Sequence, residues 1–122
     1  MPTISVVDDD LSARKSLKRL ITVAGYTAAV YDSAETFADA QAAETSDCVI
    51  LDVHLPGKSG LELQAELVAS CAGCPIIFIT AFDDESARSL ALQAGAFAFL
   101  RKPLDTERLL DVIQAALESH GG

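Results

Sequence analysis

The sequence predicts a single α/β domain with a mainly parallel sheet and helices on both of its faces. First, apolar runs alternate five times with stretches of helical periodicity along the 122 residues. Second, two of the runs, Cys48–Leu51 and Ile76–Thr80, are almost continuously apolar, which is typical of parallel strands covered on both sides. Strand–helix alternation favours right-handed crossovers, and these place helices on both faces of the sheet. The length and the 50% hydrophobic content predict one compact domain over residues 1–122.

Five segments are predicted to form strands because short apolar runs end at turn residues or at carboxylates. In chain order they are Thr3–Val7, Thr27–Tyr31, Cys48–Leu51, Ile76–Thr80 and Ala96–Leu100.

Five helices are predicted between and after these strands from apolar residues that recur on one helical face. The first helix places Leu17, Leu20, Ile21 and Ala24 on one face and ends at Gly25. The second is an Ala-rich helix over Ser33–Ala42, and Asp32 and Glu35 resemble a capping pair at its start. The remaining helices are Leu61–Ser70, then Glu85–Ala94 with Ala87, Leu90, Ala91 and Ala94 on one face, and a last helix that begins near Asp105 and carries Leu109, Leu110, Ile113, Ala116 and Leu117.

The composition excludes several classes of function. Nine basic and 18 acidic residues give a net charge of −9, which disfavours direct binding of nucleic acid because phosphate contacts require Lys and Arg. No apolar run reaches the ~18 residues of a membrane span. The first predicted strand begins almost at the N-terminus and leaves no room for a signal peptide, so we expect a cytoplasmic location.

Three cysteines raise the question of metal or redox chemistry. Cys71 and Cys74 form a CxxC pattern, but no second such pair completes a structural zinc site. A redox pair normally opens a helix after a strand, whereas this pair follows a predicted helix and precedes Pro75. We therefore interpret the pair as ordinary thiols in a loop and Cys48 as a small core residue.

Acidic residues follow two of the predicted strands at the point where each strand ends. Asp8, Asp9 and Asp10 come directly after the first strand, and Asp52 ends the third. If these strands are parallel neighbours, their carboxylates converge at one edge of the sheet. Carboxylates held close together repel one another, and a hard divalent cation with oxygen ligands relieves that repulsion. The pattern therefore predicts a divalent cation site.

Two further strand ends carry polar side chains toward the same edge. Thr80 ends the fourth strand and is followed by Ala81 and Phe82, and Lys102 comes directly after the fifth. In open α/β sheets, ligands bind beyond the C-terminal ends of the strands, where the strand order reverses. We therefore expect these residues and the acids to form one site.

Four motifs in this order, over nearly the whole chain, resemble the receiver domain of two-component response regulators. They are Val7-Asp8-Asp9-Asp10, Leu51-Asp52-Val53-His54-Leu55-Pro56-Gly57-Lys58-Ser59-Gly60, Ile79-Thr80-Ala81 and Leu100-Arg101-Lys102-Pro103-Leu104. Two more tracts, Arg14–Leu17 and Asp32–Phe37, are similar to the nitrogen-fixation regulator subgroup. The resemblance implies a flavodoxin-like (βα)5 fold with strand order 2-1-3-4-5.

The resemblance also implies a role for each acid. Asp52 is expected to be the phosphoacceptor, because a carboxylate can act as a nucleophile toward phosphorus. Asp8 and Asp9 are expected to bind Mg²⁺ together with Asp52 and the backbone carbonyl of His54, with Mn²⁺ as a substitute ion. Asp10 is expected to cap the first helix rather than bind the metal.

The other motif residues are expected to hold and sense the phosphoryl group. Lys102 is expected to pair with one phosphoryl oxygen and the Thr80 hydroxyl to bond another, while the small side chain of Ala81 leaves access to the site. Pro103 is a candidate for a cis peptide bond.

Three aromatic residues have expected roles in switching and in the lifetime of the phosphorylated state. Phe99 is placed as the aromatic switch, which turns inward when phosphorylation draws Thr80 inward. The alternative is that Phe99 is simply a core residue, as Phe97 could be. His54 and Phe82 occupy the second positions after Asp52 and Thr80, and we expect their bulky rings to hinder the attacking water. The alternative is that His54 is a bystander, which a lone histidine more often is.

The function that follows from the resemblance is a signalling switch rather than an enzyme with an external substrate. A histidine kinase or a phosphotransfer protein is expected to donate the phosphoryl group, and the face of the fourth helix, fifth strand and fifth helix is expected to change shape. A phosphorylation-dependent homodimer through the last helices is left open. Without a helix-turn-helix pattern, the chain either acts alone or is the N-terminal part of a longer regulator.

Two alternative functions use similar folds. A phosphatase of the haloacid-dehalogenase type also has a nucleophilic aspartate after a strand, but it expects an acid two residues later, where this chain has His54. A non-catalytic flavodoxin-like binding domain expects a hydroxyl- and Gly-rich loop after the first strand, where this chain has three acids. Because the fold alone does not separate these functions, the site residues decide among them.

Overall fold

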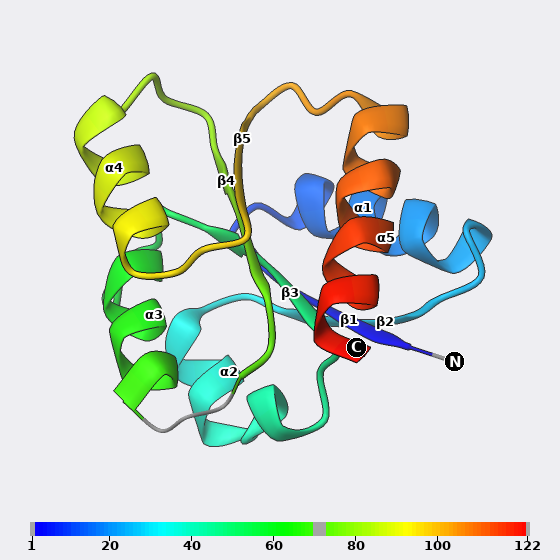
Figure 1. Cartoon of the computed structure of the whole chain (residues 1–122), viewed down its shortest axis with the longest axis horizontal. Helices are drawn as coiled ribbons and strands as arrows, with labels where there is room; N and C mark the ends of the chain where they lie inside the picture. The colour runs from blue at the N-terminus through cyan, green and yellow to red at the C-terminus, as the bar shows by residue number, and fades with distance from the viewer. Residues whose placement is uncertain (1, 70–72, 122) are drawn as a thin grey trace.

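A computed structural model describes residues 2–69 and 73–121 and contains the predicted parallel sheet with helices on both faces (Figure 1). The elements alternate regularly along the chain. In order they are β1 (Thr3–Val7), α1 (Leu11–Val23), β2 (Thr27–Tyr31), α2 (Ala34–Asp39), the 3₁₀ helix η1 (Ala42–Glu44), β3 (Cys48–Asp52), α3 (Gly60–Ala69), β4 (Ile76–Thr80), α4 (Glu85–Gln93), β5 (Ala98–Arg101) and α5 (Thr106–Gly121).

The strands pair in the order β2-β1-β3-β4-β5, and each of the four pairings is parallel. This is the flavodoxin-like order, so the expected fold is confirmed. The order reverses between β1 and β3, where β3 ends on Asp52 and β1 is followed directly by Asp8. The register aligns Val7 with Leu51 and Thr80 with Arg101, so the residues that follow these positions reach one edge of the sheet.

Two hydrophobic layers cover the sheet, as the apolar strands predicted. On one face, α1 and α5 pack through Leu17, Ile21, Leu109 and Ile113 onto alternate strand residues such as Ile50 and Ile79. On the other face, α2, α3 and α4 pack through Phe37, Leu63, Ala87 and Ala91 onto the intervening strand residues, among them Leu51 and Phe78. The central strands β3 and β4 are buried along their whole length.

The second helix is shorter than the predicted Ser33–Ala42. It ends after Asp39, and Gln41 adopts a left-handed conformation with φ 53° before η1 begins. The Ala-rich tract has a high helix propensity, but the chain turns so that Ala42 is buried in the core beside Phe37. Tertiary packing therefore overrides local propensity at this position.

The predicted capping pair of Asp32 and Glu35 is also wrong. The N-cap of α2 is Ser33, whose hydroxyl accepts a hydrogen bond from the Thr36 backbone N–H at 3.0 Å. Asp32 accepts a bond from the Thr36 hydroxyl. The Glu35 carboxylate instead reaches the loop before α3, where it accepts a hydrogen bond from the backbone N–H of Lys58.

The helix α4 and the start of β5 each differ from the prediction in one detail. Only Ala87 and Ala91 of the predicted apolar face are buried, whereas Leu90 is 58% exposed and Ala94 also faces solvent. The strand β5 begins at Ala98 rather than Ala96. The Ala96 N–H donates to the Ala91 carbonyl and closes the end of α4, so it is not available to the sheet.

Candidate functional site

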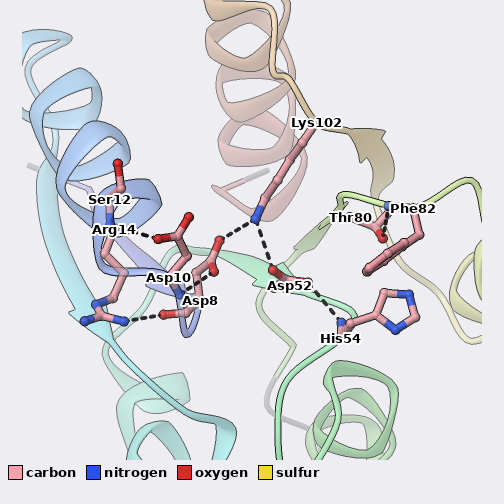
Figure 2. A network of polar contacts seen from close by, with 9 residues as sticks. All are labelled: Asp8, Asp10, Ser12, Arg14, Asp52, His54, Thr80, Phe82 and Lys102. Carbon is pink, nitrogen blue, oxygen red and sulfur yellow. Dashed lines mark hydrogen bonds and ion pairs between the residues drawn. The ribbon is translucent and has the colours of Figure 1, made fainter.

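The predicted site residues meet at the C-terminal edge of the sheet (Figure 2). Asp8 follows β1 and is fully buried, Asp52 ends β3 and is 6% exposed, and Asp9 is exposed at the rim. Carboxylate oxygens of these three residues lie within 4.8 Å of one another. The convergence predicted from strand ends is therefore present in the structure.

Lys102 lies between the two buried acids. Its Nζ donates to Asp8 Oδ2 at 2.9 Å and to Asp52 Oδ2 at 3.1 Å. Figure 2 shows the lysine side chain reaching from the end of β5 to both carboxylates. One ammonium thus offsets part of the repulsion between two carboxylates that the sheet holds together.

Burial and the neighbouring charges shift the pKa values of Asp52 and Lys102. Burial raises the pKa of Asp52 above its ordinary value, although the His54 backbone hydrogen bond and the Lys102 charge act in the opposite direction. Burial lowers the pKa of Lys102, but the hydrogen bond to Asp8 and the charge of Asp52 outweigh burial and raise it overall. The acids therefore stabilise the charged form of Lys102, while burial disfavours the charged form of Asp52.

Backbone hydrogen bonds fix the orientation of the two buried carboxylates. Asp8 Oδ1 accepts from the Asp10 N–H at 3.0 Å, and Asp52 Oδ1 accepts from the His54 N–H at 2.9 Å. Asp10 caps α1 by accepting from the Ser12 N–H, as predicted. The side chains are therefore oriented by their own loops before any ligand binds.

Arg14 is a site residue that the sequence interpretation did not assign. Its Nη1 donates to the backbone carbonyl of Asp8 at 2.8 Å and so ties the first turn of α1 to the end of β1 (Figure 2). The sequence pattern that could have pointed to Arg14 is a basic residue in the first turn of the helix that follows the three acids. Side-chain to backbone contacts of this kind leave no distinctive sequence pattern.

Thr80 is buried at the end of β4, and its hydroxyl accepts a hydrogen bond from the Phe82 N–H at 3.1 Å. Its carbonyl accepts from the Lys102 N–H at 2.7 Å, so the residue also links β4 to β5. Ala81 follows at the surface. The loop therefore orients the hydroxyl oxygen, and the hydroxyl can still donate its proton to a ligand.

A known protein family matches most of this chain. The model of the response regulator receiver domain matches residues 4–114. The chain belongs to the response regulator receiver family. Receiver domains are signal switches of two-component systems rather than enzymes in the usual sense.

Relatives of this receiver domain include transcriptional regulators of known type. It is 41% identical over 115 residues to the transcriptional regulatory protein TdiR of Thauera aromatica, covering 94% of this chain and 51% of TdiR. It is 36% identical to the transcriptional regulatory protein FixJ of Bradyrhizobium diazoefficiens, covering 93% of this chain and 56% of FixJ. The likeness to the nitrogen-fixation regulators is thus confirmed, and the chain spans about half the length of these relatives.

Solved structures agree with the fold of this receiver domain. The response regulator StyR superposes with a TM-score of 0.92 at 42% identity, over 98% of this chain and 61% of that one. The structure titled FixJ-N superposes with a TM-score of 0.87 at 32% identity, over 97% of this chain and 94% of that one. Within residues 2–69 and 73–121, no helix is long and apolar enough to cross a membrane.

The rings of His54 and Phe82 touch beside the acidic site of the receiver domain. Their centroids are 4.9 Å apart in an edge-to-face arrangement, and Phe82 is 60% exposed. His54 Nε2 also lies 3.6 Å from Asp84 Oδ2 at the start of α4. The pair forms an aromatic wall near Asp52 and Thr80 (Figure 2).

Two residues close to Lys102 in the sequence, Pro103 and Phe99, were singled out by the resemblance. The Lys102–Pro103 peptide bond is cis. Phe99 is half-buried, and its ring lies 6.1 Å from that of the fully buried Phe78. Phe97, two residues earlier, is 38% exposed and is not a core residue.

Of the described cysteines, neither Cys48 nor Cys74 lies in the acidic site. Cys48 is buried in β3, and burial raises its pKa to about 12, which keeps the thiol protonated. Burial also raises the pKa of Cys74. Cys71 lies outside the described residues, so the CxxC interpretation is not tested; Cys48 is a small core residue, as predicted.

Proposed function

We propose that this receiver domain accepts a phosphoryl group on Asp52 from a histidine kinase or a phosphotransfer protein. The observation that carries the proposal is the placement of Asp52. Its carboxylate ends a buried strand, is held by the His54 N–H and by Lys102, and lies in a cluster with two further acids. A buried carboxylate in these surroundings suits phosphoryl transfer, because the negative charge of the transferring phosphoryl group lies close to the Lys102 ammonium.

The donor set fits Mg²⁺, with Mn²⁺ as a substitute. Asp8, Asp9 and Asp52 supply hard carboxylate oxygens, and we assign the backbone carbonyl of His54 as a further ligand. When bound, the cation neutralises the acids and the charge of the incoming phosphoryl group. Lys102 is then released from part of its pairing with Asp8 and Asp52.

The transfer step forms one bond and breaks one bond. A carboxylate oxygen of Asp52 attacks the phosphorus, the phosphorus–nitrogen bond of the donor phosphohistidine breaks, and the imidazole leaves with the electron pair and takes up a proton. The product is an acyl phosphate on Asp52. Lys102 and the Thr80 hydroxyl hold its oxygens, while Ala81 leaves space for the donor.

The signal leaves the site through Thr80 and Phe99. The Thr80 hydroxyl donates its proton to a phosphoryl oxygen and moves toward it, and the ring of Phe99 moves further inward against Phe78. The switch is a shift between two packing arrangements of Thr80 and Phe99, and the charge of the phosphoryl group favours one of them. The α4–β5–α5 face then controls the output, which in relatives such as TdiR and FixJ is named as transcriptional regulation.

The proposed setting is the cytoplasm, with the whole domain spanning residues 1–122. The net charge of −9 disfavours direct contact of this domain with nucleic acid. A phosphorylation-dependent homodimer through the α4–β5–α5 face is the proposed route to the output. In this proposal the receiver domain catalyses its own phosphorylation and slow dephosphorylation and acts on no external substrate.

Incubation with acetyl phosphate and Mg²⁺ tests the proposal directly. We expect the intact mass to rise by one phosphoryl group, and peptide mapping after borohydride reduction should place the adduct on Asp52. With excess EDTA the initial rate of adduct formation should fall by at least about a hundredfold, because the acids are then not neutralised. An unchanged intact mass with Mg²⁺ and with Mn²⁺ would overturn the proposal.

Removing the aromatic wall should shorten the life of the phosphorylated state. In Phe82→Ala and His54→Ala, water gains access to the phosphoryl group. We therefore expect dephosphorylation to be about threefold to tenfold faster, which corresponds to an activation barrier lower by about 0.7 to 1.4 kcal/mol. The measurement is the decay of the phosphorylated mass after removal of the donor. Phe97→Ala, which removes an exposed ring away from the wall, should leave the half-life unchanged; equal half-lives in all variants would show that the wall has no such role.

A further inference from the structure

A side chain from α2 holds the loop that connects β3 to α3. Glu35 Oε2 accepts a hydrogen bond from the backbone N–H of Lys58 at 3.2 Å. Bonds from its own backbone N–H and from that of Lys58 hold the pKa of Glu35 below its ordinary value, so it is ionised at neutral pH. The contact joins residues 23 positions apart in the sequence and comes from a helix that contributes no other residue to the site.

The fit of Glu35 against the loop is tight. Gly57 has φ +74°, in the left-handed region that favours glycine. A Cβ atom at Gly57 would collide with Glu35 Oε2. The carboxylate therefore lies directly over the turn, in the space that a side chain at position 57 would occupy.

The same loop carries the backbone carbonyl assigned to the metal. At its base, the Gly60 N–H donates to the Val53 carbonyl at 3.0 Å, and the Cβ space of Gly60 is filled by the Asp52 carbonyl. Leu55 is buried in the core beside α2 and α3. These contacts fix the base and the middle of the loop, and Glu35 fixes its tip at Lys58. His54 lies between the base and the tip.

We propose that Glu35 is a positioning residue for the divalent cation site, acting through the Gly57–Lys58 turn on the backbone carbonyl of His54. The inference rests on the proposed function, because it assigns that carbonyl as a metal ligand. A backbone ligand cannot be reoriented by its own side chain, so its direction depends on what holds the loop. Partners that orient metal ligands commonly affect metal affinity as strongly as some of the ligands do.

Calorimetric titration of the whole chain with MgCl₂ tests this role. We expect Glu35→Ala to raise the Kd for Mg²⁺ about threefold to tenfold, at the low end of effects seen for such partners. Glu35→Gln keeps an oxygen acceptor for the Lys58 N–H and should stay within about twofold of the wild type. The thermal midpoint in EDTA should be nearly the same in all three proteins, because Glu35 is exposed; a merely structural role would change the midpoint instead.

Glu66→Ala is the matched control. Glu66 pairs with the Lys58 ammonium at 2.6 Å, so its removal deletes the same charge near the same lysine and leaves the backbone bond in place. We expect no change in Mg²⁺ affinity. An equal rise in Kd for Glu66→Ala and Glu35→Ala would assign the effect to charge and overturn the proposal.

Gly57→Ala provides an independent lesion of the same contact. The added methyl group collides with the Glu35 carboxylate, so Gly57→Ala should weaken Mg²⁺ binding more in the wild type than in a Glu35→Ala background. If the effects of Gly57→Ala and Glu35→Ala on the Kd for Mg²⁺ are additive, or if Glu35→Ala keeps the wild-type Kd, the role of Glu35 is overturned. The proposal that Asp52 is phosphorylated would not be affected by either result. Absence of Mg²⁺ binding by the wild type would overturn this proposal and the metal assignment together.

Discussion

Replacing Asp52 by Asn should abolish the phosphoryl adduct formed from acetyl phosphate and Mg²⁺. The amide is nearly the same size and keeps an oxygen that can accept from the His54 N–H, but it lacks the nucleophilic carboxylate. We expect the rate of adduct formation to fall by at least about a thousandfold, equivalent to about 4 kcal/mol. The measurement is the intact mass over time with the wild type in parallel.

Asp10→Asn is the matched control for this variant. Asp10 neighbours the acidic site but caps α1 through the Ser12 N–H, and Asn is an equally good cap. Its phosphorylation should therefore be unchanged. An adduct that persists in Asp52→Asn at the wild-type rate would place the phosphoacceptor elsewhere and refute the assignment.

Asp52→Asn should also stabilise the metal-free protein above acidic pH. Because the pKa of Asp52 is raised on folding, the folded state binds the proton more tightly than the unfolded state. The stability from this group is complete below the unfolded pKa and is lost as pH rises through the higher folded pKa. Asp52→Asn removes that loss, so we expect its free energy of unfolding at pH 7 in EDTA to be higher, by on the order of 1 kcal/mol. Urea unfolding at pH 3 and pH 7 should show the difference only at pH 7.

Replacing Lys102 by Ala should destabilise the metal-free protein and make its stability depend on Mg²⁺. The buried carboxylates of Asp8 and Asp52 both lose the ammonium that pairs with them. Breaking one side of a fully buried ion pair costs several kcal/mol, and because Lys102 is only half-buried we expect about 2 kcal/mol. Urea unfolding in EDTA measures this loss. Saturating Mg²⁺ should restore a large part of it, because the cation binds the folded state.

Lys58→Ala serves as the comparison for this variant. Its ammonium pairs with Glu66 at the surface, where ion pairs contribute little, so we expect a change of less than about 1 kcal/mol and no dependence on Mg²⁺. Equal stabilities of Lys102→Ala and the wild type in EDTA would contradict the view that Lys102 offsets the repulsion of the acids.

Much of the fold was predictable because the sheet is buried on both faces. The continuous apolar runs of β3 and β4 are typical of central parallel strands, and Gly25 and Gly95 mark helix ends where the backbone needs positive φ. The errors fall where tertiary packing overrides local propensity. The helix α2 stops early because Ala42 packs into the core, and Leu90 remains exposed although it shares a helical face with buried alanines.

The membership of the site was predictable for a geometric reason. In a parallel sheet all strands end at the same edge, so a residue's position at a strand end determines its approximate place in space. Asp8, Asp52, Thr80 and Lys102 could be assigned to one edge in this way. Arg14 and Glu35 could not, because each acts by a side-chain bond to the backbone of another loop, and such bonds depend on how helices pack against the sheet.

Local patterns along the chain were therefore enough to predict the alternation of elements, the carboxylates at one edge and the family to which the chain is related. The contacts among the site residues emerge only in the folded molecule: Lys102 bonds both buried acids, the Thr80 hydroxyl accepts from the Phe82 N–H, and His54 and Phe82 touch. The reason is physical. Periodicity and strand ends are local properties that sequence records directly, whereas hydrogen bonds of about 3 Å depend on the register of distant strands and on the rotamers that the packed core permits.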